Sequence, residues 1–135
     1  MSDGTPILRV DLASPVPVYR QIVDQLRILL VSGELKAGDQ LPTVRQVAGD
    51  LGVHHNTVAE AYRQLAEEGW LDLRRRRGAC VVERGRPAAD PEAVTDFQRR
   101  VQELIADAVA RGASPHAVAR ALHAAGETLE GRGAL

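Results

Sequence analysis

The chain has 135 residues, a formal charge of −1 at pH 7, 44% hydrophobic residues and only 3% aromatic residues. This length holds one ordinary domain, or a small domain with an appendage. The single cysteine, Cys80, excludes an internal disulfide, and no apolar run approaches the roughly 20 residues that a membrane helix needs. The N-terminus lacks the pattern of a secretory signal, so the sequence predicts a cytoplasmic protein without a membrane span.

The positive charge of the chain is concentrated in one short stretch. Residues 1–87 hold 12 Lys and Arg against 11 Asp and Glu, whereas residues 88–135 hold 5 against 7. The stretch contains Arg74, Arg75, Arg76, Arg77, Arg84 and Arg86. Since a local cluster of basic residues attracts nucleic acid even when the net charge is near zero, this stretch is a candidate DNA contact.

The first expected helix begins at Pro17, because the first helical position does not need an N–H group. Apolar residues then recur at helical spacing, and Gly33 is the expected end. The apolar face consists of Tyr19, Ile22, Val23, Leu26, Leu29 and Leu30. Residues 1–16 are expected to form an extended arm, which is either packed on the domain or disordered.

Two short helices joined by a tight turn are expected next. Thr43 and Gln46 have the spacing of a capping box, and Gly52 is the expected end of the second helix. The third helix follows Val53 and ends at Gly69. Two helices separated by a few residues that include a glycine are typical of a helix-turn-helix.

A short β-hairpin is expected after the third helix. Leu71 and Leu73 alternate with polar residues as in a strand, and residues 80–83 form the expected return strand. The turn between them contains Arg75, Arg76, Arg77 and Gly78. The sequence therefore predicts a mainly α fold with a small β-wing, a winged helix-turn-helix domain over residues 1–86 with its core in residues 17–83.

The remaining residues, 87–135, are expected to form a helical hairpin that dimerises the protein. Asp90-Pro91 and Ser114-Pro115 each combine a capping side chain with a proline at the first helical position. Apolar residues at heptad and helical spacing follow: Val94, Phe97, Val101, Leu104, Ile105, Ala108, Val118, Leu122 and Leu129. Because two helices alone bury little surface, this apolar face is expected to meet a second copy of the chain.

Residues 17–82 resemble the DNA-binding domain of the GntR family of bacterial transcriptional regulators. The resemblance is carried by the motifs SGELKAGDQLPT, LPTVR, NTV, AYRQL and EEGWL. The short all-helical tail is similar to that of the YtrA-type subfamily, in which a small module dimerises the protein. The resemblance implies a homodimeric repressor of a near-palindromic DNA operator, which in many such proteins controls its own operon with ABC transporter genes.

The start of the third helix is the expected base-reading element, because a recognition helix places its N-terminal residues nearest the bases. These residues are His54, His55, Asn56 and Thr57. Asn pairs with adenine, and Thr contacts a base or phosphate. One of the four is alternatively only the helix cap. The family usually has Ser, Thr or Asn in place of His54 and often Arg in place of His55, so an arginine–guanine contact is not expected there.

Three further groups of residues are candidate DNA contacts. The resemblance implies that Arg45, on the second helix, reaches DNA and reads guanine; otherwise it is a solvated surface residue. Arg63 is a candidate phosphate contact, or it pairs with Glu60 or Glu67 along the helix. The wing tip is expected to enter the minor groove, where narrow A·T tracts attract arginine, or else it is a solvated loop.

No enzyme activity, cofactor or metal is expected. The sequence has no phosphate-binding glycine loop and no nucleophile elbow, and His116 and His123 have only a weak i, i+7 spacing. The absence of lysine after Lys36 argues against the pyridoxal-phosphate module that some relatives carry. The alternative function is a winged-helix adaptor that docks a protein partner. A small-molecule effector between tail and domain, or at the dimer seam, is left open.

Overall fold

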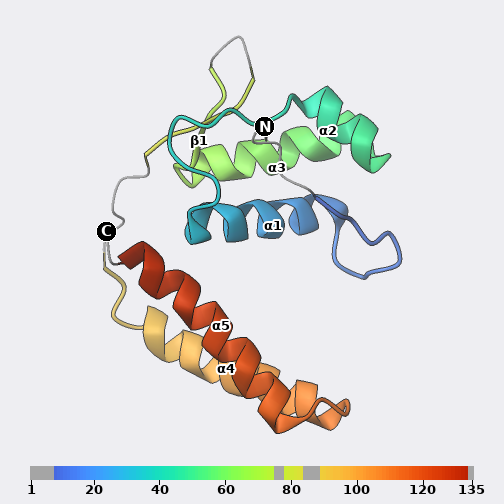
Figure 1. Cartoon of the computed structure of the whole chain (residues 1–135). Coiled ribbons are helices and arrows are strands. Elements are labelled where there is room, and N and C mark those ends of the chain that lie inside the picture. The colour runs from blue at the N-terminus through green and yellow to red at the C-terminus, as the bar shows by residue number, and fades with distance from the viewer. Residues whose placement is uncertain (1–7, 75–77, 84–88, 134–135) are drawn as a thin grey trace. The chain divides into compact units, whose positions relative to one another are not determined.

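The computed structural model describes residues 8–74, 78–83 and 89–133. Contacts divide the chain into two compact units, Met1–Gly85 and Arg86–Leu135, and each is described by itself. Figure 1 shows their elements. The first unit contains α1 (Val18–Ser32), α2 (Val44–Leu51), α3 (His55–Glu67), β1 (Leu71–Asp72) and β2 (Cys80–Val81), and the second contains α4 (Ala93–Ala110) and α5 (Pro115–Gly133).

Helix α1 packs against α3 in the first unit (Figure 1). Helix α1 begins at Val18, one residue later than expected, and Pro17 is its N-cap. The carbonyl oxygen of Pro17 accepts hydrogen bonds from the N–H groups of Arg20 and Gln21. Gly33 ends it in the left-handed conformation, with φ of 87°, as expected. A residue with a β-carbon is strained at this φ, so the glycine sets where the chain leaves α1.

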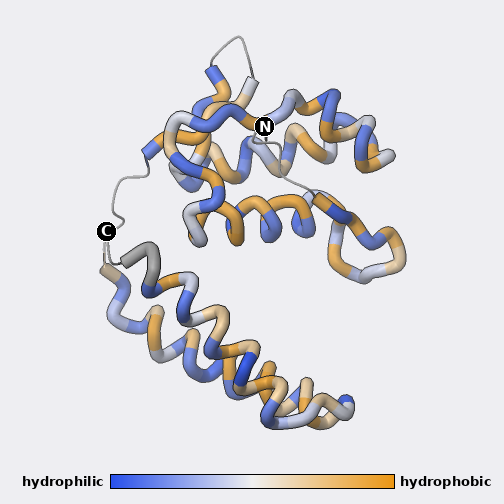
Figure 2. Tube along the Cα trace, in the orientation of Figure 1, coloured by the Kyte–Doolittle hydropathy of each residue, from blue (hydrophilic) through white to orange (hydrophobic). Residues whose placement is uncertain are grey.

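The core of the first unit is mainly aliphatic and contains residues from every helix and strand of that unit. Its buried members are Ile22, Val23, Leu26, Leu30, Leu35, Leu41, Val47, Ala48, Val58, Ala61, Tyr62, Leu65, Leu71, Ala79 and Val81. Burying one such medium-sized apolar side chain contributes about 1.5–3 kcal/mol. Figure 2 shows the alternation of apolar and polar residues along these helices. The core thus holds α2 and α3 in a fixed relation to α1.

The turn between α2 and α3 is set by local sequence signals. The Thr43 side chain accepts the N–H of Gln46, whose own side chain accepts the N–H of Thr43, which completes the expected capping box. Gly52 ends α2 with φ of 70°. Helix α3 starts at His55 and ends at Glu67, two residues before the expected end at Gly69.

The β-wing is joined to the segment that precedes α2. Strand β1 pairs antiparallel with β2, with Leu71 opposite Val81. On the other edge of β2, Gln40 forms a bridge with Cys80, and the N–H of Leu41 donates to the carbonyl of Ala79 at 2.9 Å. The wing therefore starts from the same backbone that leads into α2.

Both strands are shorter than the sequence predicted. They were expected to include Leu73 and to run to Glu83, but each has two residues. The Asp72 side chain explains the early end of β1, because its Oδ1 accepts the N–H of Arg74 at 2.9 Å. This local bond occupies the N–H of Arg74 and so competes with strand pairing.

The N-terminal arm is packed on α1 over its described residues, which settles the two alternatives for that part. Leu8 and Val10 are half-buried against the core, whereas Leu12 is exposed. The side-chain amide of Gln25 pairs with the backbone N–H and carbonyl of Arg9. Gln21, one turn earlier on α1, forms the same pair of hydrogen bonds with the backbone N–H and carbonyl of Asp11.

The second unit is an antiparallel hairpin of α4 and α5 (Figure 1). Helix α5 starts at Pro115 as expected, and the Ser114 hydroxyl accepts the N–H of Ala117 at 3.0 Å. Helix α4 starts at Ala93 rather than at Pro91, because the Asp90 side chain accepts the N–H of Glu92 and forms a turn first. Within the described ranges, no helix combines the length and the apolar character of a membrane span.

The hairpin buries only part of its apolar residues. Val101, Ile105, Ala108 and Val118 are half-buried, and α4 contains no fully buried residue. Large apolar side chains stay exposed on the same unit: Val94, Phe97, Leu104, Leu122 and Leu129. Phe97 is 62% and Leu104 67% exposed. The nine residues expected to face one interface therefore divide into four that are half-buried within the hairpin and five that are exposed.

Candidate nucleic-acid interface

The start of α3 lies at the surface, and His54 is its cap. His54 has an extended backbone, with φ of −70° and ψ of 140°, and its Nδ1 accepts the N–H of Asn56 at 3.1 Å. Its carbonyl oxygen accepts the N–H of Thr57 at 3.0 Å. His54 therefore takes the part of a cap that Ser, Thr, Asn or Asp usually plays. Its ring nevertheless remains exposed.

The second histidine stacks on the first. The ring centroids of His54 and His55 are 4.5 Å apart, with an angle of 25° between the ring planes. His55 and Asn56 are exposed, and Thr57 is half-buried. The structure thus brings these four side chains together at one helix end, where an amide, two imidazoles and a hydroxyl offer both donors and acceptors.

Arg45 lies on the exposed side of α2. Val44 is half-buried and Val47 and Ala48 are buried, so the helix packs on its other side and leaves Arg45 in solvent. Among the described residues Arg45 forms no ion pair. Its planar guanidinium is therefore free to bind two acceptors of one guanine or a phosphate.

The wing is described only at its base. Arg75, Arg76 and Arg77 lie outside the described residues. Gly78 has φ of 96°, and a β-carbon placed on it would lie 3.9 Å from Cγ2 of Thr43. The return arm of the wing therefore passes beside the first residue of the α2 capping box. The positive φ favours glycine at this position.

Arg74 is the basic wing residue that the structure does describe, and sequence reasoning gave it no role of its own. Its side chain is exposed, and its Nε lies 3.2 Å from Oδ1 of Asp72. The hydrogen bond that Arg74 donates to the Asp72 carboxylate raises the pKa of Arg74, so the guanidinium stays charged. The signal was present in the sequence, since Arg74 begins the run of four arginines and follows Asp72 by two residues.

Arg63 is exposed on α3 and does not pair along its helix. In the described part of the chain it forms no ion pair with Glu60 or Glu67. The following acid, Glu68, instead binds Arg27 of α1, with Nε to Oε1 at 2.9 Å. Arg63 therefore remains a candidate phosphate contact.

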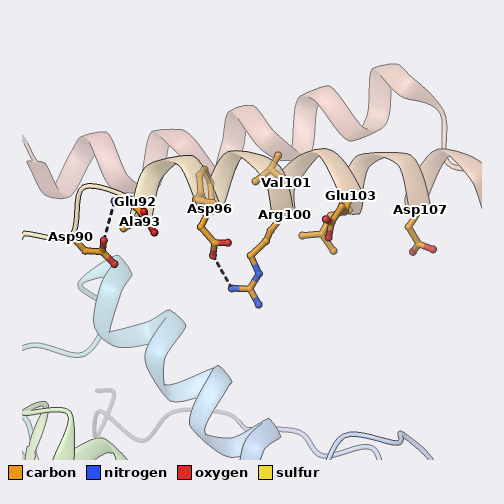
Figure 3. Close-up of a pocket in the computed structure, with 10 residues that line it drawn as sticks. Asp90, Glu92, Ala93, Asp96, Arg100, Val101, Glu103 and Asp107 are labelled. Atoms are coloured by element: carbon orange, nitrogen blue, oxygen red, sulfur yellow. Dashed lines mark hydrogen bonds and ion pairs between the residues drawn. The ribbon is translucent and has the colours of Figure 1, made fainter.

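The second unit carries a surface of the opposite charge (Figure 3). An open pocket runs along α4 and is lined by Asp90, Glu92, Ala93, Asp96, Phe97, Arg100, Val101, Glu103, Leu104 and Asp107. Asp96 is shared by Arg99, at 2.5 Å, and Arg100, at 3.9 Å, while Glu103 holds the other end of Arg99. Carboxylates repel phosphate, so this surface suits a protein partner better than DNA.

No metal centre is found in the part of the chain that the structure describes, where no three His, Cys, Asp or Glu side chains converge. Cys80 is a free, half-buried thiol on β2. The candidate site is thus one of hydrogen-bond donors and arginines on α2 and α3, beside the wing.

The comparison with known protein families agrees with this geometry. The model of the family described as "Bacterial regulatory proteins, gntR family" matches residues 18–81. The match thus runs from the first residue of α1 to the last residue of β2, and it includes both helices of the candidate interface.

Relatives extend the similarity into the second unit. The HTH-type transcriptional repressor YtrA of Bacillus subtilis is 33% identical over 102 residues, which cover 76% of this chain and 78% of that protein. The structure of YtrA from Sulfolobus acidocaldarius, a GntR-family transcription factor, has a TM-score of 0.55 at 34% identity and covers 78% of this chain and 99% of that one. A GntR-family regulator from Listeria monocytogenes, with a TM-score of 0.53 at 25% identity, covers 84% of this chain and 97% of the other.

Proposed function

The chain belongs to the GntR family and is a YtrA-type DNA-binding transcriptional regulator, and we propose that it acts as a homodimeric repressor of a near-palindromic operator. DNA binding is assigned to residues 1–86 and dimerisation to residues 87–135. The observation that carries the proposal is the exposed start of α3, which follows α2 after a tight turn, together with the exposed Arg45 on α2.

The DNA-reading residues follow from this arrangement. A recognition helix enters the major groove with its N-terminal end foremost, which assigns base contacts to His54, His55, Asn56 and Thr57. Arg45 is assigned a guanine or phosphate contact, and Arg63 a phosphate contact. The wing tip, residues 75–78, is assigned to the adjacent minor groove.

The homodimer is supported by the exposed apolar residues of the hairpin. Phe97 and Leu104 are more than half exposed on α4, and Leu122 and Leu129 are exposed on α5. Large apolar side chains exposed in such a number on a small unit favour an interface. A second copy of the hairpin offers the same residues about a two-fold axis, and a stable interface buries about 800 Å² on each partner.

A dimer determines the form of the operator. Two recognition helices related by a two-fold axis read two inverted half-sites, whose centres lie about 34–36 Å apart or a multiple of that distance. A protein bound there occludes the promoter. The Bacillus relative is a repressor by its name, and the YtrA-type resemblance points to an operon with ABC transporter genes. Such a regulator works on chromosomal DNA in the cytoplasm.

The alternative, a winged-helix adaptor for a protein partner, predicts a different salt dependence. Contacts to phosphate release counterions, so DNA affinity falls steeply with salt concentration. The exposed Arg45 and Arg63 favour DNA over an adaptor role.

Footprinting on the DNA upstream of the protein's own gene, over a salt series, tests the proposal. The comparison uses wild type, Arg45→Ala and Arg120→Ala. Arg120 is an exposed arginine of α5. Its variant therefore loses one positive charge, as Arg45→Ala does, at a residue outside the candidate interface. We expect a short protected palindrome for wild type and Arg120→Ala, and about 5- to 100-fold weaker binding for Arg45→Ala.

Diffuse binding that is equally strong in all three proteins would contradict a specific operator in that region. Selection of binding sites from random duplex DNA then separates a distant operator from a lack of specificity. An enriched palindrome would uphold the proposal, and no enriched motif would overturn it.

A further inference from the structure

The two ring nitrogens of His54 have different tasks. Nδ1 accepts the N–H of Asn56 at 3.1 Å and so caps α3. Only an unprotonated ring nitrogen accepts a hydrogen bond, so the neutral imidazole must carry its proton on Nε2. The cap therefore selects one tautomer, in which Nε2–H is a donor.

This donor is exposed and has a fixed direction. The His54 side chain is exposed, and within the described ranges its Nε2 forms no hydrogen bond. The ring of His55 stacks on it with centroids 4.5 Å apart. A 180° flip of the His54 ring about Cβ–Cγ would break the cap bond, and a rotation about Cα–Cβ would break both the cap bond and the stack. The donor is thus oriented before DNA arrives, which reduces the entropy lost on binding.

We propose that His54 binds the operator as a single hydrogen-bond donor, through Nε2–H, to an acceptor atom of DNA, and that His55 positions its ring. This inference rests on the proposed function and states which atom of one residue within it binds DNA. The partner is N7 or O6 of guanine, N7 of adenine, O4 of thymine or a phosphate oxygen. The N4 amino group of cytosine offers only a donor and is rejected.

The residue type matters because the usual caps present different groups. A serine cap also accepts the backbone N–H, and the O–H that it can still donate lies close to the backbone rather than at the far edge of a ring. An imidazole separates the acceptor and the donor on opposite sides of one rigid ring. His54 can therefore cap the helix and contact DNA at the same time, so the two roles are not alternatives.

The first arm of the test measures the tautomer in the free protein. Long-range ¹H–¹⁵N NMR spectra at mildly alkaline pH distinguish the two ring nitrogens of each histidine. We expect Nε2–H for His54, and His54→Ser identifies its signals by their loss. A protonated Nδ1 in the neutral ring would overturn the proposal, whatever the protein binds.

The second arm measures DNA recognition by His54→Ser, which keeps a capping oxygen but has no donor at the position of Nε2. Wild type, His54→Ser and His116→Ala are each used to select duplexes from a random library. His116 is an exposed histidine of α5 and serves as the control. We expect His54→Ser to keep the wild-type Tm and to bind the wild-type sequence roughly tenfold more weakly, as for one lost hydrogen bond.

Modified duplexes then identify the acceptor. If a 7-deazapurine at one position weakens wild type but not His54→Ser, the partner is N7 of a base, and loss of preference for guanine or thymine at one position indicates O6 or O4. If only an uncharged methylphosphonate has this effect, the partner is a phosphate. Wild-type affinity and base preference in His54→Ser would overturn the proposal and leave His54 as a cap alone.

The positioning role of His55 has its own comparison. His55→Ala removes the stack, whereas His55→Phe keeps a flat ring there without donors or acceptors. We expect the alanine variant to bind more weakly than the phenylalanine variant, because both lose the polar groups of His55 but only alanine loses the stacked ring. Equal losses in both would mean that the stack adds nothing to the contact that His55 makes itself and would overturn the positioning role.

The two arms separate this inference from the function on which it rests. If wild type enriches no DNA motif, the proposed operator binding fails and the His54 contact fails with it, even with the expected tautomer. If wild type enriches a palindrome and His54→Ser enriches the same one with equal affinity, operator binding stands and only the His54 contact fails.

Discussion

The hydroxyl group of Tyr62, on the buried side of α3, donates a 2.7 Å hydrogen bond to the carbonyl oxygen of Pro42, just before the capping box of α2. The bond joins residues 20 positions apart in the sequence. It therefore ties the middle of the recognition helix to the segment that leads into the preceding helix.

We expect Tyr62→Phe to lower the free energy of unfolding by about 1 kcal/mol, because the ring stays packed while one hydrogen bond is lost. Urea denaturation of the full chain measures the difference. Tyr19→Phe, at the other tyrosine of the sequence, is the matched control and should differ less from wild type. Equal effects of the two variants would mean that the bond to Pro42 adds nothing.

Burial raises the pKa of the Tyr62 hydroxyl above its ordinary value of about 10. The folded protein then keeps this proton at a pH where the unfolded chain releases it, so folding is favoured less as the pH rises. The contribution is complete below about pH 10 and is lost above it, by at most about 1.4 kcal/mol per pH unit. The stability of wild type minus that of Tyr62→Phe should decline above that pH, and a constant difference would contradict the prediction.

Arg27 of α1 and Glu68, directly after α3, form a two-point ion pair, with Nε to Oε1 at 2.9 Å and Nη2 to Oε2 at 2.5 Å. The hydrogen bond to Glu68 raises the pKa of Arg27. We expect a double-mutant cycle with Arg27→Met and Glu68→Gln to give a coupling of about 1 kcal/mol that decreases with salt.

The pair Arg111 and Asp107 at the C-terminal end of α4 is the control for that cycle. It is more exposed, at 80% and 65% against 36% and 24% for Arg27 and Glu68, and its shortest distance is 3.6 Å. We expect its coupling to be about 0.3–0.5 kcal/mol, as for other helical i, i+4 pairs. If both cycles gave the same coupling, the two-point geometry would carry no special stability.

The arm on α1 offers a local test by hydrogen exchange. The side chain of Gln25 accepts the N–H of Arg9 at 2.9 Å, and that of Gln21 accepts the N–H of Asp11 at 2.8 Å. We expect Gln25→Ala to speed exchange at Arg9 more than at Asp11, because each glutamine protects one amide. Gln21→Ala should reverse the order. Equal acceleration at both sites in both variants would show that the arm opens as one piece.

The dimer prediction concerns Leu104, which is 67% exposed on α4. Leu104→Glu places a charge in the proposed interface and should yield monomers by light scattering at micromolar concentration, with unchanged helix content. Ala106→Glu introduces the same side chain at another exposed position of α4 and should remain dimeric. A dimeric Leu104→Glu protein would place the interface elsewhere.

Local sequence signals predicted most helix boundaries, because each boundary depends on bonds within a few residues. Gly33, Gly52 and the Thr43–Gln46 pair act where the sequence indicated. The boundaries that were predicted wrongly also depend on bonds between residues close in the sequence. Asp72 ends β1 early by a turn, and Asp90 delays α4 in the same way, since short acidic side chains compete for backbone N–H groups.

Contacts between distant residues could not be predicted in this way. The capping box was legible from spacing alone, whereas the partner of Tyr62 depends on how α3 lies across the segment before α2. Likewise, the sequence offered Glu60 and Glu67 as partners of Arg63, but it gave no sign that Glu68 binds Arg27 on another helix. Such pairs depend on helix packing, which periodicity alone does not determine.

The sequence by itself determined the order of elements, the winged helix-turn-helix and the family, because apolar periodicity, caps and glycines act over short distances. Only the tertiary structure decided that the His54 ring caps α3 while stacking on His55, and that Phe97 and Leu104 stay exposed while Ile105 is half-buried. The reason is physical: a repeat pattern identifies which residues are apolar, but the direction of each side chain and the neighbour that covers it follow from packing in three dimensions.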